Sequence, residues 1–265
     1  MFKQIYKPIN HLWRIFATGF CFALFGLGGL FMSVTILPLQ RLIISDKLKQ
    51  KAVARMTVHY GFRIFVNTMQ FLGVFRVKIN GAKQLQQLKG KIIIANHPSL
   101  VDVVVLISQI KNADCVVKSH LFKNPFMRGV LRASGYISNS DPDQLMEDCA
   151  ASLALGNNIV IFPEGTRTNK NKPLKLQRGF ANIAMRSQTD LLFILLKVTP
   201  STLTKDNVWY NVPERRFDFD LTVKQPIAIS PYRDEFGDNI TKAVRHLTRH
   251  IESLFKEELT FNDRT

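Results

Sequence analysis

The first part of the chain alternates long apolar stretches with short basic ones. No charged residue occurs between Arg14 and Arg41. As a helix these 26 positions would be about 39 Å long, which exceeds the ~30 Å hydrocarbon layer of a bilayer. A second, mostly apolar stretch covers residues 51–75, after Pro38 and a polar link at residues 45–49. This pattern predicts two helices, separated near Pro38 and the link. The glycines of the first stretch would permit a bend or the close approach of a second helix.

The second predicted helix carries a narrow polar stripe. Its polar side chains follow at four-residue steps: Lys51, Arg55, His59, Arg63 and Asn67. This spacing places them on one side of a helix whose other sides are apolar. Such a helix suits a membrane interface, with its basic groups toward lipid phosphates. Residues 1–75 are therefore predicted to be a two-helix membrane anchor that either spans the bilayer or dips into one leaflet.

The positive charge is concentrated in this same region. The formal net charge is +16, and residues 1–90 contain thirteen Lys or Arg against a single acid, Asp46. Residues 91–265 hold only +4. Basic residues around a long apolar run are typical of proteins at membrane surfaces and uncommon in nucleic-acid-binding domains. We therefore expect membrane lipids and no nucleic acid as partners. The expected location is the cytoplasmic face of a membrane, which in a bacterium is the inner membrane.

From residue 76 onward, short apolar runs alternate with helix-like segments. The strand-like runs are Arg76–Asn80, Lys91–Ala95, Cys115–Lys118, Asn158–Phe162, Leu191–Val198 and Phe217–Val223. The helix-like segments are Leu100–Ile110, Leu121–Ser134, Asp143–Leu155, Leu176–Ser187 and Asn239–Glu258. This alternation predicts an α/β domain over residues 76–265, with a mixed, largely parallel sheet flanked by helices. Functional residues in such sheets tend to lie in loops at strand ends.

The first candidate loop, residues 96–102 (NHPSLVD), follows a predicted strand and opens a helix. The His97 imidazole can accept a proton at cell pH. Asp102, in the first helical turn, can receive the other ring N–H and fix the tautomer. A substrate hydroxyl would then be the nucleophile. The spacing alone also fits an ordinary loop histidine beside a capping serine, Ser99.

The second candidate loop, residues 162–167 (FPEGTR), follows another predicted strand. Gly165 permits a tight turn, and Arg167 offers a bidentate fork to a phosphate or carboxylate. Glu164 can hydrogen-bond a polar headgroup or orient a neighbouring basic group. Taken alone, the segment also fits a surface turn with a salt bridge.

Taken together, the loops resemble the glycerolipid acyltransferase family, whose best-known members are the 1-acylglycerol-3-phosphate acyltransferases. Residues 96–102 resemble the family's H-x-x-x-x-D block, and residues 162–167 match its F-P-E-G-T-R block letter for letter. Residues 118–135 resemble its intermediate block, and residues 198–200 resemble its V-x-P block less well. The resemblance covers about residues 50–230, and four blocks in order are far more specific than any single one.

The resemblance implies a membrane-bound O-acyltransferase. A fatty acyl chain would move from an acyl-CoA or acyl-ACP thioester to the hydroxyl of a lysophospholipid such as 1-acylglycerol-3-phosphate. In that scheme His97 is the general base and Asp102 orients it. Neither a metal nor a bound cofactor is implied, because the acyl thioester is a co-substrate. The residues that the resemblance assigns to substrate binding are Asn96, Ser99, Lys118, Glu164, Gly165, Thr166, Arg167 and Arg178.

One departure from the family bears on the acceptor. Members that use phosphate acceptors usually carry an Arg a few residues after the glycine that corresponds to Gly135. Here no Lys or Arg occurs from Ala133 to Thr166, and Asp141 stands near the expected position. A missing cation opposite a phosphate would cost about 1–3 kcal/mol of binding. The cations that remain as substitutes are Lys175, Arg178 and Lys197. The acceptor is therefore either lysophosphatidate or another hydroxylated lipid.

Three other classes of protein compete with this interpretation. A catalytically silent module that keeps the fold and binds lipid would show the same blocks. A lipid A-type late acyltransferase also uses a His–acid pair, but the FPEGTR block favours the glycerolipid group. A nucleic-acid-binding protein would place basic and stacking residues on one folded face, and the low charge of residues 91–265 argues against it.

Overall fold

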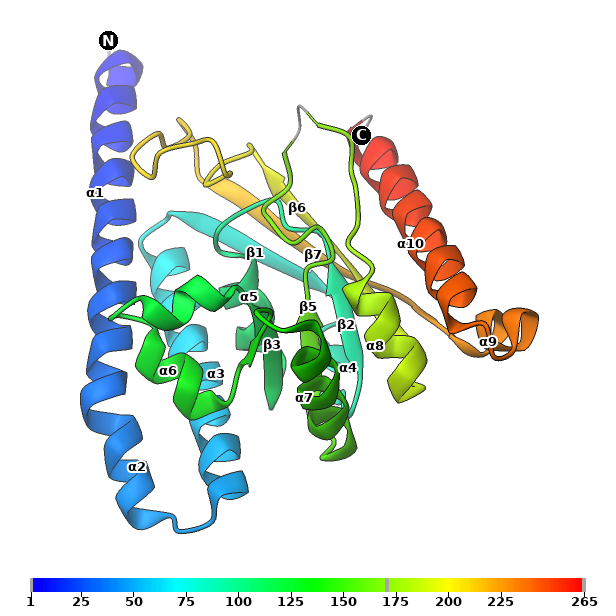
Figure 1. The fold of residues 1–265 in the computed structure, drawn as a ribbon. Coiled ribbons are helices and arrows are strands. Elements are labelled where there is room, and N and C mark those ends of the chain that lie inside the picture. Colours follow the sequence, from blue (N-terminus) through cyan, green and yellow to red (C-terminus); the bar gives the residue numbers. More distant parts are fainter. Residues whose placement is uncertain (1, 170–171, 264–265) are drawn as a thin grey trace.

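The computed structural model describes residues 2–169 and 172–263, and a seven-stranded sheet lies at its centre (Figure 1). The strands are β1 (Phe75–Asn80), β2 (Ile92–Ala95), β3 (Ala113–Val117), β4 (Ile137–Ser138), β5 (Asn158–Ile161), β6 (Leu191–Thr199) and β7 (Phe217–Ile227). Their order is β1-β7-β6-β2-β5-β3-β4. All neighbouring pairs are parallel except β6 and β7, so the predicted mixed, largely parallel sheet is confirmed.

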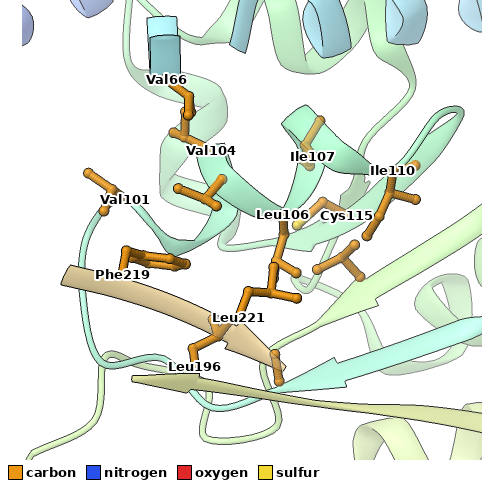
Figure 2. Close-up of a cluster of buried hydrophobic side chains, with 14 of the residues drawn as sticks. Val66, Val101, Val104, Leu106, Ile107, Ile110, Cys115, Leu196, Phe219 and Leu221 are labelled. Carbon is orange, nitrogen blue, oxygen red and sulfur yellow. The ribbon is translucent and has the colours of Figure 1, made fainter. Parts of the chain in front are cut away.

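Helices cover both faces of this sheet. After the N-terminal hairpin they are α4 (Ala82–Gln86), α5 (Asp102–Gln109), the 3-10 helix η2 (Ser119–Lys123), α6 (Arg128–Ser134), α7 (Pro142–Ala154), α8 (Gly179–Ser187), α9 (Ser230–Phe236) and α10 (Ile240–Asp263). Strand β2 is buried on both sides, and its side chains alternate between two cores. Ile93 and Ala95 join the core beneath α5, part of which is drawn in Figure 2, while Ile92 and Ile94 join the core beneath α7, α8 and α10.

Two long helical segments form an antiparallel hairpin before the sheet. They are α1 (Phe2–Phe31), the π-helical turn η1 (Met32–Ile36) and α2 (Leu37–Ile43), followed by α3 (Lys47–Phe71). Pro38 does not separate the helices as expected. It lies in the first turn of α2, where its missing N–H and fixed φ are tolerated, so the helix continues to Ile43. The predicted boundary between residues 1–75 and 76–265 falls one residue inside β1, just after the link from α3.

Apolarity differs between the two arms of the hairpin. In the described part of the chain, one helical stretch, Ile9–Ile43, is long and apolar enough to cross a membrane, and 11% of its most apolar window is buried. The large apolar side chains exposed on α1 and α2 are Ile9, Leu12, Trp13, Phe16, Phe20, Leu24, Leu27, Phe31, Leu39, Leu42 and Ile43. Helix α3 exposes fewer, namely Leu48, Tyr60, Ile64 and Phe71. The predicted N-terminal apolar helix is therefore confirmed, whereas two separate spans are not distinguished.

The polar stripe of α3 turns inward at its centre, which corrects the expectation that its basic groups face lipid phosphates. Arg55 and His59 are only 6% and 2% exposed. His59 Nδ1 lies 2.7 Å from the Ile107 carbonyl oxygen in α5. Lys51 and Arg63, on either side of them, are exposed. The four-residue spacing showed that these side chains share one side of a helix, but it did not indicate that the α/β domain covers part of that side.

Arg55 ties α3 to the amino ends of two strands. Its guanidinium donates to Asn112 Oδ1 at 2.8 Å, to Asp114 Oδ1 at 2.9 Å and to Asn157 Oδ1 at 3.3 Å. Asp114 also accepts a hydrogen bond from Ser152 and is 2% exposed. Burial raises the pKa of Asp114, against the opposing effect of the Arg55 charge. Because both ions are buried, removing either partner would leave the other uncompensated.

Helix α1 lies against two loops of the α/β domain and approaches them at its glycines. A Cβ added at Gly29 would lie 2.7 Å from the Phe126 carbonyl oxygen, in the link between η2 and α6. One added at Gly19 would lie 3.0 Å from the Trp209 ring, in the β6–β7 connection. Gly28, by contrast, has nothing within 4 Å of such an atom. Close approach at these glycines was expected for a second helix, whereas the structure shows it at Gly19 and Gly29 for loops of the α/β domain.

Candidate active site

Three connections meet at one edge of the sheet, because the strands before them are parallel neighbours. Strands β5, β2 and β6 are adjacent, so the loops after them lie side by side at their carboxyl ends. Thr168 N donates to the His97 carbonyl at 2.7 Å, and Leu100 N donates to the Leu203 carbonyl at 3.1 Å. The two loops singled out in the sequence, together with the start of the β6–β7 connection, thus form one continuous structure.

His97 and Asp102 are directly hydrogen-bonded. His97 Nδ1 lies 2.7 Å from Asp102 Oδ2, and that oxygen also accepts from Ser99 N at 2.7 Å. The His97 side chain is 16% exposed and that of Asp102 is 0% exposed. The His97 ring stacks on Phe162, with ring centroids 4.3 Å apart. A neutral imidazole that donates from Nδ1 has Nε2 as its proton acceptor, so this geometry suits a general base.

The electrostatics of Asp102 follow from its burial. Withdrawal from water raises the pKa of this carboxyl from 3.8 to about 6, against the opposing effect of its hydrogen bonds to His97 and Ser99. Its second oxygen, Oδ1, is buried and has no hydrogen-bond partner among the described residues. The charged carboxylate is thus held in an unfavourable environment, in which an adjacent imidazolium would be strongly stabilised.

Glu164 joins the two loops from the other side. Its Oε1 accepts hydrogen bonds from His97 N at 3.0 Å and from Thr168 Oγ1 at 2.7 Å. Burial raises the pKa of Glu164. Gly165 is exposed at the tip of the turn with φ +67°, and its N–H donates to the Phe162 carbonyl at 2.9 Å. Glu164 therefore fixes the backbone of the histidine loop, and only a glycine adopts this turn without strain.

Arg167 is hydrogen-bonded to the third connection, which joins β6 to β7. Its Nη1 donates to the Leu203 carbonyl at 2.9 Å and to the Thr204 carbonyl at 2.7 Å. The Leu203 carbonyl thus receives both Arg167 and Leu100 N, and Leu203 itself has the left-handed φ of +53°. Such strain persists where surrounding contacts determine it. The sequence predicted a guanidinium that faces a ligand, whereas the structure uses part of it to hold the β6–β7 connection.

The remaining predicted site residues divide into buried and exposed groups. Both polar atoms of the Asn96 side chain bond the Leu196 backbone at 2.8 Å, so Asn96 supports the loop from within the sheet. Ser99 is fully buried. Thr166 is half-buried, whereas Lys118 and Arg178 are exposed. Arg178 follows Gln177, whose N–H donates to the Pro163 carbonyl at 2.7 Å, and Lys118 follows β3 at the same edge of the sheet.

Sequence reasoning assigned no role to three residues that shape the site. Phe162 enters the sequence prediction only as the first residue of the FPEGTR block, although its ring stacks on the His97 imidazole. Thr168 lies just beyond that block and bonds both loops. Leu203 lies in a segment with no recognised motif. Proximity to a block could have drawn attention to Phe162 and Thr168, whereas nothing in the sequence indicated the role of Leu203.

Comparisons with known proteins agree on one kind of relative. An acyltransferase family model matches residues 76–197. A 1-acyl-sn-glycerol-3-phosphate acyltransferase of Cocos nucifera is 27% identical over 178 residues, covering 63% of this chain and 53% of the relative. One of Helicobacter pylori is 32% identical over 120 residues, covering 43% of this chain and 48% of the relative. The chain thus spans about half the length of these two relatives, but 78% of one from Borreliella burgdorferi that is 22% identical.

A solved structure shares the fold over almost the whole chain. The crystal structure of the 1-acyl-sn-glycerophosphate (LPA) acyltransferase PlsC from Thermotoga maritima aligns with a TM-score of 0.62 and 18% sequence identity. The alignment covers 94% of this chain and 98% of that one. The likeness therefore includes the N-terminal helices as well as the sheet.

Proposed function

Since this chain belongs to the acyltransferase family that includes the 1-acylglycerol-3-phosphate acyltransferases, we propose that it transfers a fatty acyl chain from an acyl thioester to a lysophospholipid hydroxyl. The observation that carries this proposal is the 2.7 Å hydrogen bond between His97 Nδ1 and the buried Asp102 carboxylate, in a loop joined to the FPEGTR turn. This arrangement supplies a base and an orienting acid without a nucleophile of the protein's own.

The proposed reaction has two steps at His97. Its Nε2 takes the proton of the acceptor hydroxyl while the hydroxyl oxygen attacks the thioester carbonyl carbon. The C–S bond of the resulting tetrahedral intermediate then breaks, and the leaving thiolate receives the proton from the imidazolium. Throughout, Asp102 stabilises the imidazolium through Nδ1–H. The ester bond formed replaces the thioester bond broken, and no oxidant or metal takes part in this scheme.

The donor and the headgroup contacts are also part of the proposal. The donor is acyl-CoA or acyl-ACP, both of which present the thioester on an anionic carrier. Among the predicted binding residues, we assign direct headgroup contact to the exposed cations Lys118 and Arg178. Glu164 and Arg167 act mainly by positioning the loops, because both already bond protein groups.

We further propose that the apolar hairpin associates with the cytoplasmic face of a membrane without crossing it. The helical segment from Phe2 to Ile43 would be about 60 Å long, twice the hydrocarbon thickness. Its glycine side contacts the α/β domain at Gly19 and Gly29. A perpendicular crossing would draw this polar domain into the bilayer, whereas a helix in the interface exposes only its apolar side to lipid.

The test is a transfer assay with the purified chain, radiolabelled acyl-CoA or acyl-ACP, and a panel of lysolipids with and without a phosphomonoester. We expect an ester product with wild type and a loss of at least a hundredfold in turnover with His97→Ala. The matched control is His246→Ala, which removes an exposed histidine on α10 and should leave turnover unchanged. A chain that binds lipid equally well with and without His97, and forms no ester with any acceptor, would be the silent lipid-binding module.

A further inference from the structure

A separate cavity lies at the closed end of the hairpin. It has a volume of about 280 Å³ and lies between α2, α3 and α6. Helix α3 begins beside this cavity and ends 25 residues later next to β1, about 37 Å away along its axis. The start of β1 lies on the same side of the sheet as the carboxyl ends of β6 and β2, and His97 follows directly after β2. The cavity is therefore at the opposite end of the molecule from the candidate active site. It is lined by Leu37, Gln40, Arg41, Lys47, Gln50, Lys51, Ala54, Arg132 and Ala133.

The charge of this cavity has one sign. Four of its lining residues are cations, Arg41, Lys47, Lys51 and Arg132, and no carboxylate lines it in the described part of the chain. None of the four forms an ion pair within 4 Å among those residues. Four cations around a small volume repel one another, and this repulsion is relieved when an anion binds between them.

Two further features favour a phosphate group. Arg132 belongs to the α/β domain, whereas the other cations belong to the hairpin, so an anion in the cavity would contact both parts. Gln40 lines the cavity, and its Oε1 is buried without a hydrogen-bond partner among the described residues. A phosphate that carries a hydroxylated substituent offers oxygens to the cations and a donor to such an acceptor.

The surroundings point to a lipid as the source of that phosphate. Leu42 and Ile43, which follow Arg41, are 85% and 73% exposed, and Leu48, which follows Lys47, is 55% exposed. Basic side chains therefore alternate with solvent-exposed apolar side chains. This combination is typical of sites where acyl chains contact the apolar groups and the headgroup contacts the cations.

We propose that the α2–α3–α6 cavity binds the phosphate headgroup of an anionic phospholipid and fixes the closed end of the hairpin to the membrane surface. The site is distinct from the acceptor site near His97 and does not depend on the proposed catalytic function. Its occupant is a bilayer lipid that is neither acyl donor nor acceptor in the same turnover.

The test measures partition of the full-length chain onto sedimented vesicles of phosphatidylcholine, alone and mixed with phosphatidylglycerol. Arg132→Gln and Lys51→Gln should each weaken binding to the mixed vesicles by about tenfold, as expected for the loss of a hydrogen bond between charged groups. Lys49→Gln is the matched control, because Lys49 is an exposed cation on the same hairpin that does not line the cavity.

Salt and a soluble competitor separate the possible outcomes. In about 0.5 M salt diffuse attraction is screened, so Lys49→Gln should match wild type while Arg132→Gln stays about tenfold weaker. Equal losses for Lys49→Gln and Arg132→Gln would overturn the proposal in favour of diffuse attraction. Displacement of vesicles by millimolar inorganic phosphate or glycerol phosphate would identify a site for soluble anions instead. Vesicle binding involves no turnover, so this result is independent of the acyl-transfer assay.

Discussion

The buried carboxylate of Asp102 leads to opposite predictions for stability and for turnover. Asp102 has a folded-state pKa of about 6 against an ordinary value of 3.8, a difference of about two units. The folded state therefore prefers the protonated form, and ionisation costs about 3 kcal/mol of stability above the folded-state pKa. An Asp102→Asn side chain has the same shape and no charge. We allow about 1 kcal/mol for a weakened hydrogen bond and expect the variant to be about 2 kcal/mol more stable at about pH 7.5.

The sign of the pH dependence provides the check. As the pH falls through about 6, Asp102 in the folded state takes up a proton before Asp102 in the unfolded chain does, so the stability of wild type increases. The increase is complete once Asp102 of the unfolded chain is also protonated, near pH 3.8. The variant lacks this gain, so its advantage should disappear by about pH 4. Urea unfolding followed by circular dichroism measures the difference. A pH-independent difference, or a variant less stable than wild type at about pH 7.5, would refute the reasoning.

Turnover should respond in the other direction. Asparagine cannot stabilise the imidazolium and does not select the tautomer that donates from Nδ1, so kcat should fall on the order of a thousandfold. In wild type, kcat/KM should decline below about pH 6, where the Asp102 carboxylate takes up a proton and no longer stabilises the imidazolium. An Asp102→Asn enzyme within tenfold of wild type would show that this carboxylate does not orient the base.

Three further substitutions, the first with a matched control, test how the fold around the site is supported. Gly29→Ala places a Cβ 2.7 Å from a backbone oxygen and should cost about 1–3 kcal/mol in urea unfolding, whereas Gly28→Ala, with nothing within 4 Å, should be neutral or slightly stabilising. Arg55→Met leaves a buried carboxylate unpaired and should cost about 3–5 kcal/mol by the same measurement, and equal stability to wild type would contradict the buried ion pair. Arg167→Met removes the donor to two carbonyls of the β6–β7 connection, so amide exchange over residues 200–216 should accelerate at least tenfold.

The central strands β2, β5 and β6 were predictable because they are buried on both faces. Runs such as Ile92–Ala95 and Leu191–Thr199 are almost continuously apolar, which is how parallel strands in an α/β protein appear in sequence. Strand β4 (Ile137–Ser138) was missed because two residues show no periodicity. The segment predicted as one helix over residues 121–134 is instead the 3-10 helix η2 and then α6, interrupted at Pro125, which disfavours helix in the residue before it.

Within the candidate site, local spacing was informative and long-range contact was not. A histidine and a carboxylate five positions apart across a helix start can meet, so the pair at His97 and Asp102 could be foreseen. The use of Arg167 to hold a loop 36 residues away could not, because it depends on the neighbouring positions of β2, β5 and β6 in the sheet. For the same reason the sequence did not indicate that Arg55 pairs with the buried Asp114, because the pattern of α3 resembles that of a helix at a membrane surface.

The buried ion pair on α3 has a practical consequence for any attempt to obtain a water-soluble form by deleting the N-terminal hairpin. Cutting before β1 would remove the cation that neutralises the core carboxylate Asp114 and would expose the side chains that Val58, Val66 and Met69 now cover. The shorter polypeptide would aggregate. A cut in the link between α2 and α3, near Ser45, retains both the counter-ion and the covering helix, and it removes only Ala17, Cys21 and Leu37 from the buried residues of the same core.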